Sequence, residues 1–279
     1  DRPITAGFDV YHRKITFEDI NRVVNYIDQR TGASVVVGLP VGRFTRVYTN
    51  YAYEVVNIEG LEAVIDPELL PFIDAGRRYE SRFTPSFVHN TVDNPWTPRS
   101  GVKYTATMSF TGGPLGGTLD FYKPTAEAIF YIPHTRRTAL GLRFEGAYVR
   151  PFGDTVKLPY YQRFYLGGET QIRGYDVGDV GPKDEEGREL RGNKFALFNA
   201  EYYFDIGGPL RAVLFFDAGQ TFLEGENIQI KRFRTSTGAE MRFIMPVLNV
   251  PFRLIWAWNP HRDEGQPKTI FKFAVGTTF

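Results

Sequence analysis

The strongest constraint in this sequence is an alternation of apolar and polar residues that recurs along almost the whole chain. In VKYTATMSF, residues 102–110, every second side chain is apolar, and the residues between them are lysine, threonine or serine. Such a period of two places successive side chains on opposite faces of a β-strand. The sequence therefore predicts an all-β protein. About twelve segments carry the pattern, at roughly 4–13, 33–39, 45–57, 79–91, 102–111, 119–132, 138–149, 194–205, 211–221, 234–245, 251–258 and 270–279.

Two kinds of β-protein are consistent with this alternation. A soluble sandwich buries one face of each sheet and exposes the other to water. A membrane barrel turns its apolar face to lipid and its polar face to a watery lumen. Aromatic residues make up 15% of the chain, with 24 Phe and 16 Tyr, although the mean hydropathy is negative. No apolar run approaches the length of a membrane-spanning helix, so any crossing of a membrane falls to the strands.

The connections between the segments favour the barrel, because they alternate between long and short. The long ones lie at about 14–32, 58–78, 112–118, 150–193, 222–233 and 259–269. The short ones lie at 40–44, 133–137, 206–210 and 246–251, with an intermediate one at 93–101. Outer-membrane barrels carry long extracellular loops on one rim and tight periplasmic turns on the other. The chain is thus predicted to be a transmembrane antiparallel β-barrel in the outer membrane of a bacterium.

Two of the long connections contain segments with helical spacing. In residues 17–30, apolar side chains recur every three to four positions after a capping Thr16, and in residues 66–74 Pro67 follows a capping Asp66. A helix on the membrane surface and a loop that packs on itself are both consistent with these patterns. We interpret both segments as self-packing loops.

Several functions are disfavoured by composition. Lys and Arg total 33 against 32 Asp and Glu, which predicts no nucleic-acid partner. Cysteine is absent and the histidines are scattered, so neither a disulfide framework nor a metal site is expected. No nucleophile elbow, phosphate-binding loop or zinc-protease motif occurs, and we expect no enzyme activity and no cofactor. Because the chain starts at Asp1 without Met or an apolar leader, we expect a processed or shortened product. The histidines are His12, His89, His134 and His261.

The longest connection, at about 150–193, contains a short motif that resembles a known family. With three other motifs in the same order, it is similar to the C-terminal barrel of the BamA/TamA superfamily of outer-membrane insertases and transporters. The first motif is the family's loop-six signature, and the second is a strand that ends in Phe-x-Asp-x-Gly. The third precedes a strand, and the last is a terminal strand with glycine and a final aromatic residue. The matching residues are Ile172, Arg173, Gly174 and Tyr175; Phe215, Asp217 and Gly219; Asp93, Asn94, Pro95, Pro98 and Gly101; and Gly276 with Phe279.

The resemblance implies a sixteen-strand barrel preceded by periplasmic POTRA domains. The twelve segments would then be strands five to sixteen, and residues 1–279 would form part of the C-terminal barrel domain. Either the chain is a fragment of that barrel, or twelve strands close on themselves, which an even number permits. An unpaired strand edge in lipid leaves backbone groups unsatisfied, which costs several kcal/mol for each group.

Arg173 needs carboxylates if loop six folds into the lumen, because a buried charge must be paired. Strand alternation places three acidic residues on the inward face of neighbouring strands: Glu201, Asp217 and Glu240. Asp217 is the first choice, by alternation and by the family resemblance, and Glu240 the second. Gly174 is expected to permit the chain reversal that presents Arg173, and Tyr175 to stack beside it.

The resemblance also implies a function. It suggests an insertase that folds β-barrel proteins into the outer membrane through the edge of its last strand, by strand addition. Its partners would be unfolded outer-membrane proteins, membrane lipid and accessory lipoproteins bound through POTRA domains. The alternative is a protein-translocating pore of the same superfamily, such as a two-partner-secretion transporter. The residues expected at the strand edge and its terminal signal are Phe271, Phe273, Val275, Gly276 and Phe279.

Overall fold

The structure of the chain is a computed structural model, which describes residues 3–17, 26–60, 76–185, 190–245, 250–262 and 265–279. In this described part, none of the helices has the length and apolar character needed to cross a membrane.

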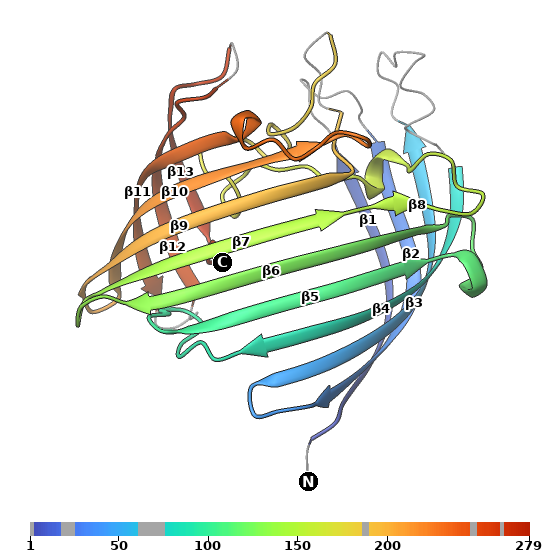
Figure 1. Cartoon of the computed structure of the whole chain (residues 1–279), viewed down its shortest axis with the longest axis horizontal. Helices are drawn as coiled ribbons and strands as arrows, with labels where there is room; N and C mark the ends of the chain where they lie inside the picture. The colour runs from blue at the N-terminus through green and yellow to red at the C-terminus, as the bar shows by residue number, and fades with distance from the viewer. Residues whose placement is uncertain (1–2, 18–25, 61–75, 186–189, 246–249, 263–264) are drawn as a thin grey trace.

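One antiparallel sheet contains all the strands, and neighbours along the chain are neighbours in the sheet (Figure 1). Twelve strands form a continuous path, and the short β8 pairs with the end of β6 beside it. Because every long connection is between adjacent antiparallel strands, no crossover is required. The strands are β1 (Thr5–Phe17), β2 (Tyr26–Pro40), β3 (Thr45–Gly60), β4 (Gly76–Asn90), β5 (Gly101–Thr111), β6 (Phe121–Pro133), β7 (Thr138–Tyr148), β8 (Arg150–Pro151), β9 (Lys194–Gly207), β10 (Leu210–Phe222), β11 (Arg234–Met245), β12 (Val250–Trp258) and β13 (Thr269–Val275).

The alternation of long and short connections is confirmed where the connections are described; residues 18–25, 61–75 and 246–249 lie outside the described part. Residues 41–44, 134–137 and 208–209 join strands on one rim, with the longer turn 91–100 beside them. On the opposite rim lie 112–120, 149–193, 223–233 and 259–268. In Figure 1 the loops of this second rim lie at the top and right of the sheet, and the tight turns lie at the other ends of the strands. The rim with long loops is the extracellular one in a barrel of this kind.

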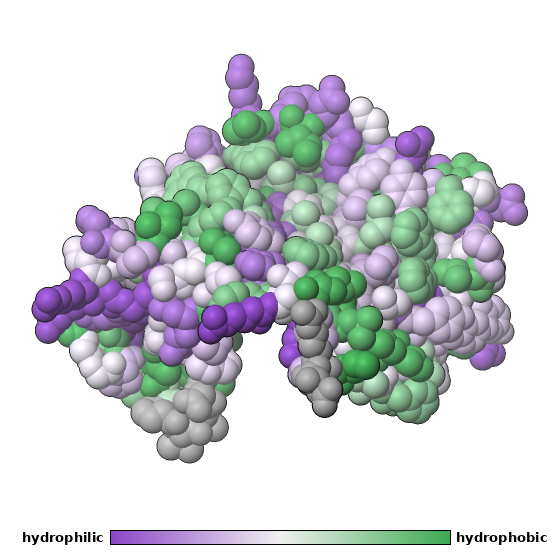
Figure 2. Space-filling model, turned by 60° about the horizontal axis from the view of Figure 1, so that its bottom comes forward, coloured by the Kyte–Doolittle hydropathy of each residue, from purple (hydrophilic) through white to green (hydrophobic). Residues whose placement is uncertain are grey.

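The two faces of the curved sheet differ as the alternation predicts. Its outer face exposes large apolar side chains, and Figure 2 shows them as contiguous hydrophobic patches with hydrophilic residues projecting at the margins. Its inner face buries charged residues, among them Glu54, Arg211 and Arg253. A sheet with lipid-facing apolar residues and an ionic interior is typical of a membrane barrel, not of a soluble sandwich.

The interpretation of residues 17–30 as a self-packing loop is wrong at both ends, and so is the alternative of a helix there. β1 continues to Phe17 and β2 begins at Tyr26, and Arg13 and Arg30 are directly paired in the ladder between them. Cross-strand hydrogen bonds outweigh the weak helical spacing, because a short isolated helix is marginally stable. The second such segment, residues 66–74, lies outside the described residues.

The sheet is open, since no pairing joins β1 to β13 among the described strands. Closure of twelve strands on themselves is therefore not observed. β12 pairs with one side of β13, and the other side of β13 has no strand partner in the described part of the chain.

The end of the chain corrects a second prediction, that the last strand runs over residues 270–279. β13 ends at Val275, and Gly276 adopts a φ of +107°. The chain then turns inward, so that Phe279 stacks on Tyr131 at 6.1 Å between ring centroids, within an inner apolar cluster that includes Tyr203. Phe271 and Phe273, by contrast, are 70% and 59% exposed on the outer face.

The faces can be tested with a charge placed on the outer one. Leu214, in the middle part of β10, is exposed on the outer face. We expect Leu214→Arg to lower the free energy of unfolding by about 2–4 kcal/mol in lipid vesicles, because the guanidinium enters hydrocarbon. Urea titrations followed by tryptophan fluorescence measure this. Leu214→Phe is the control and should unfold like the wild type; equal effects of the two substitutions would contradict the assignment of this face to lipid.

Candidate functional site: the loop-six ionic cluster

The connection 149–193, here called loop six, folds into the lumen of the curved sheet. Its backbone forms isolated bridges between Leu166 and Val180 and between Phe164 and Gly192. Apolar loop residues pack on the inward side chains Phe195 and Leu197 of β9. This cluster explains why a connection with almost no regular structure has a defined position, since burial of apolar area substitutes for a hydrogen-bonded ladder. The loop members of the cluster are Leu166, Ile172, Tyr175 and Val180.

A tight reversal at the tip of the loop presents Arg173. The N–H of Gly168 donates to the carbonyl of Tyr175 at 2.9 Å and closes the reversal. Gly174 has a φ of +91°, and its carbonyl accepts a hydrogen bond from the Asn259 side chain. A β-carbon at position 174 would collide with that side chain and with Ala257, so only glycine fits.

Arg173 is fully buried and makes a forked contact with Asp217 of β10. Its Nε donates to Asp217 Oδ2 at 2.8 Å, and its Nη2 donates to Oδ1 at 2.7 Å. The backbone N–H of Arg173 also donates to Oδ2, at 3.0 Å. Two parallel N–H···O bonds between a guanidinium and a carboxylate are strong and geometrically specific. Loop six is thereby fixed to the centre of β10.

Two more acidic residues complete the site. Nη1 of Arg173 donates to Glu201 of β9 and, at 3.1 Å, to Glu240 of β11. Two further arginines bind the same carboxylates: Arg242 pairs with both glutamates, and Arg253 of β12 pairs with Glu240 at 2.7 Å. Three arginines thus face three carboxylates, and the cluster has no net formal charge. We call these six residues the ionic cluster: Arg173, Glu201, Asp217, Glu240, Arg242 and Arg253.

The state of Arg173 follows from two opposed effects. Burial alone would lower its pKa, but the carboxylates, led by Asp217 and Glu201, outweigh burial and hold the pKa above its ordinary value. Phe215 adds a stacking contact, with its ring centroid 3.8 Å from the guanidinium carbon. This corrects the expectation that Tyr175 stacks beside Arg173. Tyr175 instead joins the apolar cluster, and its hydroxyl donates to the carbonyl of Thr235 at 3.3 Å.

The ionic cluster extends to the inward-turned end of the chain. The hydroxyl of Thr278 accepts from Arg242 at 3.0 Å and from Arg253 at 2.7 Å. On the edge strand itself, Lys272 forms ion pairs with two residues of loop six, Glu169 at 3.2 Å and Asp176 at 2.5 Å. Loop six, the edge strand and the terminal residues therefore belong to one connected polar network.

Loop six also contacts the opposite wall of the lumen. Its short 3-10 helix η2 (Tyr160–Gln162) reaches Glu80 of β4, which is fully buried. Tyr161 donates to Glu80 Oε1 at 3.0 Å, and the Gln162 amide donates to both carboxylate oxygens at 2.9 and 3.1 Å. Burial and the nearby Glu80 charge raise the pKa of Tyr161. The loop thus spans the lumen between β10 and β4.

Some members of the network were not assigned from the sequence. Alternation places Arg253 and Thr278 on the inward face, yet it does not indicate which inward residues meet across strands. The contact with Glu80 was missed altogether, because loop residues 160–162 have no periodicity that predicts where they pack. Charged residues at inward positions of adjacent strands, as at Glu240, Arg242 and Arg253, are the signal that identifies such a cluster.

Comparison with known proteins agrees with this geometry. The Omp85 superfamily domain matches residues 1–279, which is the whole chain. The chain belongs to the Omp85 superfamily. The resemblance to the BamA/TamA barrels, inferred from the four motifs, is confirmed, and this Omp85 chain is a bacterial outer-membrane β-barrel protein.

Relatives of this Omp85 chain include two proteins named outer membrane protein assembly factor BamA. The one from Nitratidesulfovibrio vulgaris is 30% identical over 100% of the chain, which covers 35% of that relative. The one from Neisseria meningitidis is 23% identical over 99% of the chain and is covered to 40%. The chain therefore spans well under half the length of these curated relatives.

Two solved structures share the fold. BamA from Haemophilus ducreyi lacking POTRA domains 1–3 superposes with a TM-score of 0.81 at 18% identity, covering 98% of this chain and 59% of that one. CdiB from Acinetobacter baumannii gives a TM-score of 0.60 at 13% identity, covering 98% of this chain and 47% of that one. At these identities the likeness supports the barrel fold alone.

The ionic cluster gives a direct test. We expect Arg173→Ala to lower the free energy of unfolding by about 3–5 kcal/mol, because it leaves buried carboxylates unpaired. Arg262→Ala, in the exposed connection 259–268, is the matched control and should have little effect. Urea titration in detergent micelles measures both. If the two alanine variants unfolded at the same urea concentration, the cluster would not stabilise the barrel.

The second contact of loop six predicts a smaller effect. Tyr161→Phe removes one donor from the buried Glu80 carboxylate and should cost about 1.5–3 kcal/mol. In a Glu80→Gln background the same substitution should cost much less, which a double-mutant cycle measures. Tyr165→Phe, whose ring is partly exposed and lies against Arg191, controls for loss of a hydroxyl in this loop. Equal costs of Tyr161→Phe in both backgrounds would show that the pair is not coupled.

Proposed function

We propose that residues 1–279 form the C-terminal barrel domain of an outer-membrane protein assembly factor, which inserts β-barrel proteins through the edge of β13. Two supports are the assembly-factor names of the relatives and their alignment with the entire chain. The substrates would be unfolded outer-membrane proteins. Accessory lipoproteins would act through periplasmic POTRA domains, three of which are lacking in the Haemophilus ducreyi structure.

The observation that carries this proposal is the lumen network that binds loop six to the edge strand β13 and to the inward-turned terminus. β13 pairs with β12 alone among the described strands, and its outward aromatic residues face lipid. Unpaired backbone groups in lipid cost several kcal/mol each, so this edge favours pairing with an incoming strand. Burial of the incoming apolar face and formation of backbone hydrogen bonds drive the reaction, and no catalytic residue or nucleotide is required.

Side-chain contacts of loop six and the ionic cluster hold the edge of β13 in position. Lys272 ties the centre of β13 to Glu169 and Asp176, and Thr278 ties the inward-turned terminus to Arg242 and Arg253. We infer that the ionic cluster holds the strand edge in the shape that accepts a substrate strand. Opening the edge further would require Lys272 or Thr278 to leave these partners.

The turn at Gly276 allows a matched test. Gly276→Val forces a β-branched residue into a backbone conformation with φ of +107°, so the terminus should lose its inward turn. We expect several-fold slower folding of a denatured outer-membrane protein into liposomes that contain this variant. Gly265→Val is the control, because Gly265 also has a positive φ and open space around it but lies in an outer loop.

The same liposomes distinguish the alternative function. A translocating pore would give large ion conductance without accelerating the folding of a substrate. Conductance of this kind, or acceleration that is unchanged by Gly276→Val, would contradict insertion through the edge of β13.

A further inference from the structure

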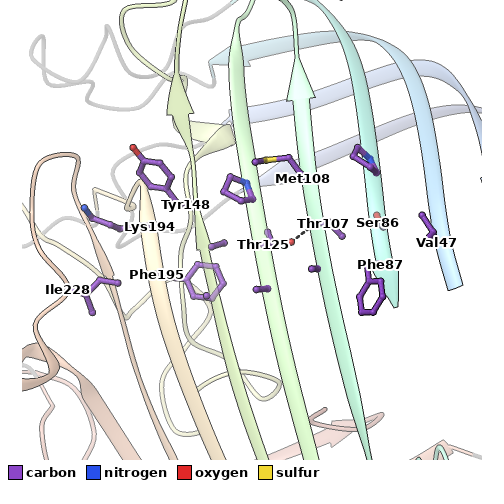
Figure 3. A pocket seen from close by; sticks show the side chains of 16 residues that line it. Val47, Ser86, Phe87, Thr107, Met108, Thr125, Tyr148, Lys194, Phe195 and Ile228 are labelled. Atoms are coloured by element: carbon purple, nitrogen blue, oxygen red, sulfur yellow. Dashed lines mark hydrogen bonds between the residues drawn. The ribbon is translucent and has the colours of Figure 1, made fainter. Parts of the chain in front are cut away.

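A long hollow crosses the lipid-facing side of the sheet on its extracellular half. Two adjoining cavities of about 910 and 1100 Å³ form it, and both lie within or above the size range of ligand sites, about 300–1,000 Å³. They share Ala106, Ala126 and Gly146, so they are parts of one depression. Figure 3 views it from close by, with Ile228, Lys194 and Tyr148 toward one end and Phe87 and Val47 at the other. We call this depression the outer groove.

Small residues at matching positions of adjacent strands create the floor of the outer groove. Ala106 pairs with Ala126, Ala126 with Gly146, and Gly146 with Ala196, across β5, β6, β7 and β9. Two positions further toward the extracellular rim, the same faces carry larger side chains, among them Met108 and Tyr148. A row of small side chains beside a row of large ones leaves a channel that runs across the strands.

The connection 223–233 forms one wall of the groove. An ion pair between Arg232 and Glu226 at 2.7 Å fixes this connection, and Phe233 packs near Phe222. Outward-facing Phe222 is consequently fully buried, whereas lipid-facing residues elsewhere are exposed. Within the same connection, Ile228 and Ile230 are 52% and 80% exposed and line the groove. Apolar residues left exposed on a loop that overhangs a lipid-facing groove indicate that lipid completes the contact.

Two lysines line the groove near its extracellular end. Lys194 begins β9, next to Tyr148 in the ladder, and Lys231 lies in the 3-10 helix η3 (Ile230–Arg232). Neither forms a salt bridge in the described part of the chain. Glu226 is paired with Arg232, and Lys194 lies near enough to contribute to the lowered pKa of that carboxyl. The groove therefore combines apolar walls with two lysines that are not held in a salt bridge by a described residue, and the complementary ligand is an acyl chain that carries a negative group.

Position determines which lipid meets this description. The groove lies toward the rim with long loops, which faces the outside of the cell, so its lysines lie at the level of outer-leaflet headgroups. In lipid there is no hydrophobic driving force for seating an acyl chain, and selectivity must come from packing and from the headgroup charge.

We propose that the outer groove binds lipid A, the phosphorylated and multiply acylated glucosamine lipid of the outer leaflet. Acyl chains lie over Ala126 and Gly146 beneath Ile228, and the phosphates contact Lys194 and Lys231. Two adjoining cavities and two separated cations fit a lipid with several chains and two phosphates better than a single-phosphate glycerolipid. This inference goes beyond the proposed assembly function and does not depend on it.

Native mass spectrometry of the purified protein in detergent, with lipid A added, tests the proposal. We expect the wild type to retain lipid A with higher affinity than phosphatidylglycerol or lipid A stripped of both phosphates. Replacing Lys194 and Lys231 by Gln should weaken retention by about fivefold for each lysine removed. Arg136→Gln, in a periplasmic turn, is the charge-matched control and should bind like the wild type.

Filling the groove provides an independent variant. Gly146 has ordinary backbone angles, and a β-carbon there meets a single carbonyl at 3.4 Å, so Gly146→Leu should fold and occupy the channel. We expect it to lose lipid A, while Ala200→Leu on the same outer face of β9 keeps it. Thermal melting in detergent checks that both variants are folded.

Three outcomes would overturn the proposal. The first is equal binding of phosphate-free lipid A. The second is preferential retention of phosphatidylglycerol by the wild type. The third is a wild-type dimer that Gly146→Leu converts to a monomer, which would assign the groove to a second copy of the chain.

Discussion

The buried pairing of Arg173 with three carboxylates is the constraint on which much of this structure depends. A lone guanidinium in that position would carry a desolvation cost of several kcal/mol, and so would each carboxylate without it. Because three arginines meet three acidic residues, the cluster is neutral, but only when loop six, β9 to β12 and their register are all in place. The cluster thus contributes specificity: it is satisfied in one arrangement of the loop and strands and penalises the others.

Strand alternation, together with the family resemblance, predicted the acidic half of this site. Glu201, Asp217 and Glu240 lie on the inward face because a one-residue slip would turn the outward aromatic residues of those strands, such as Phe216, into the lumen. Strand alternation does not show that Phe215, and not Tyr175, stacks on the guanidinium of Arg173. Both aromatic residues are near Arg173 in space, and which one stacks depends on how a loop without periodicity packs against β9 and β10.

The corrected assignments at residues 17–30 and at the end of the chain have a common physical origin. The helical spacing in residues 17–30 and the apparent continuation of the last strand to Phe279 are local patterns that tertiary contacts override. Cross-strand pairing with β1 extends β2 back to Tyr26. At the other end, Gly276 permits a turn that a side chain would resist, and Phe279 gains a stacking partner in Tyr131. The contacting residues, those of β1 in one case and Tyr131 in the other, lie outside the local patterns. The patterns therefore do not reveal these contacts.

The network also makes the edge of β13 and loop six thermodynamically dependent on each other. Loop six binds Lys272 directly and reaches Thr278 through Arg253, which also donates to the carbonyl of Glu169. A substrate strand that pairs more tightly with a displaced β13 must therefore weaken the contacts between loop six and β13. By reciprocity, a loop that is loosened by other means must make displacement of β13 easier by the same free energy. The span from β10 to Glu80 on β4 extends this dependence across the lumen, so the curvature of the open sheet and the state of its edge are coupled through one loop.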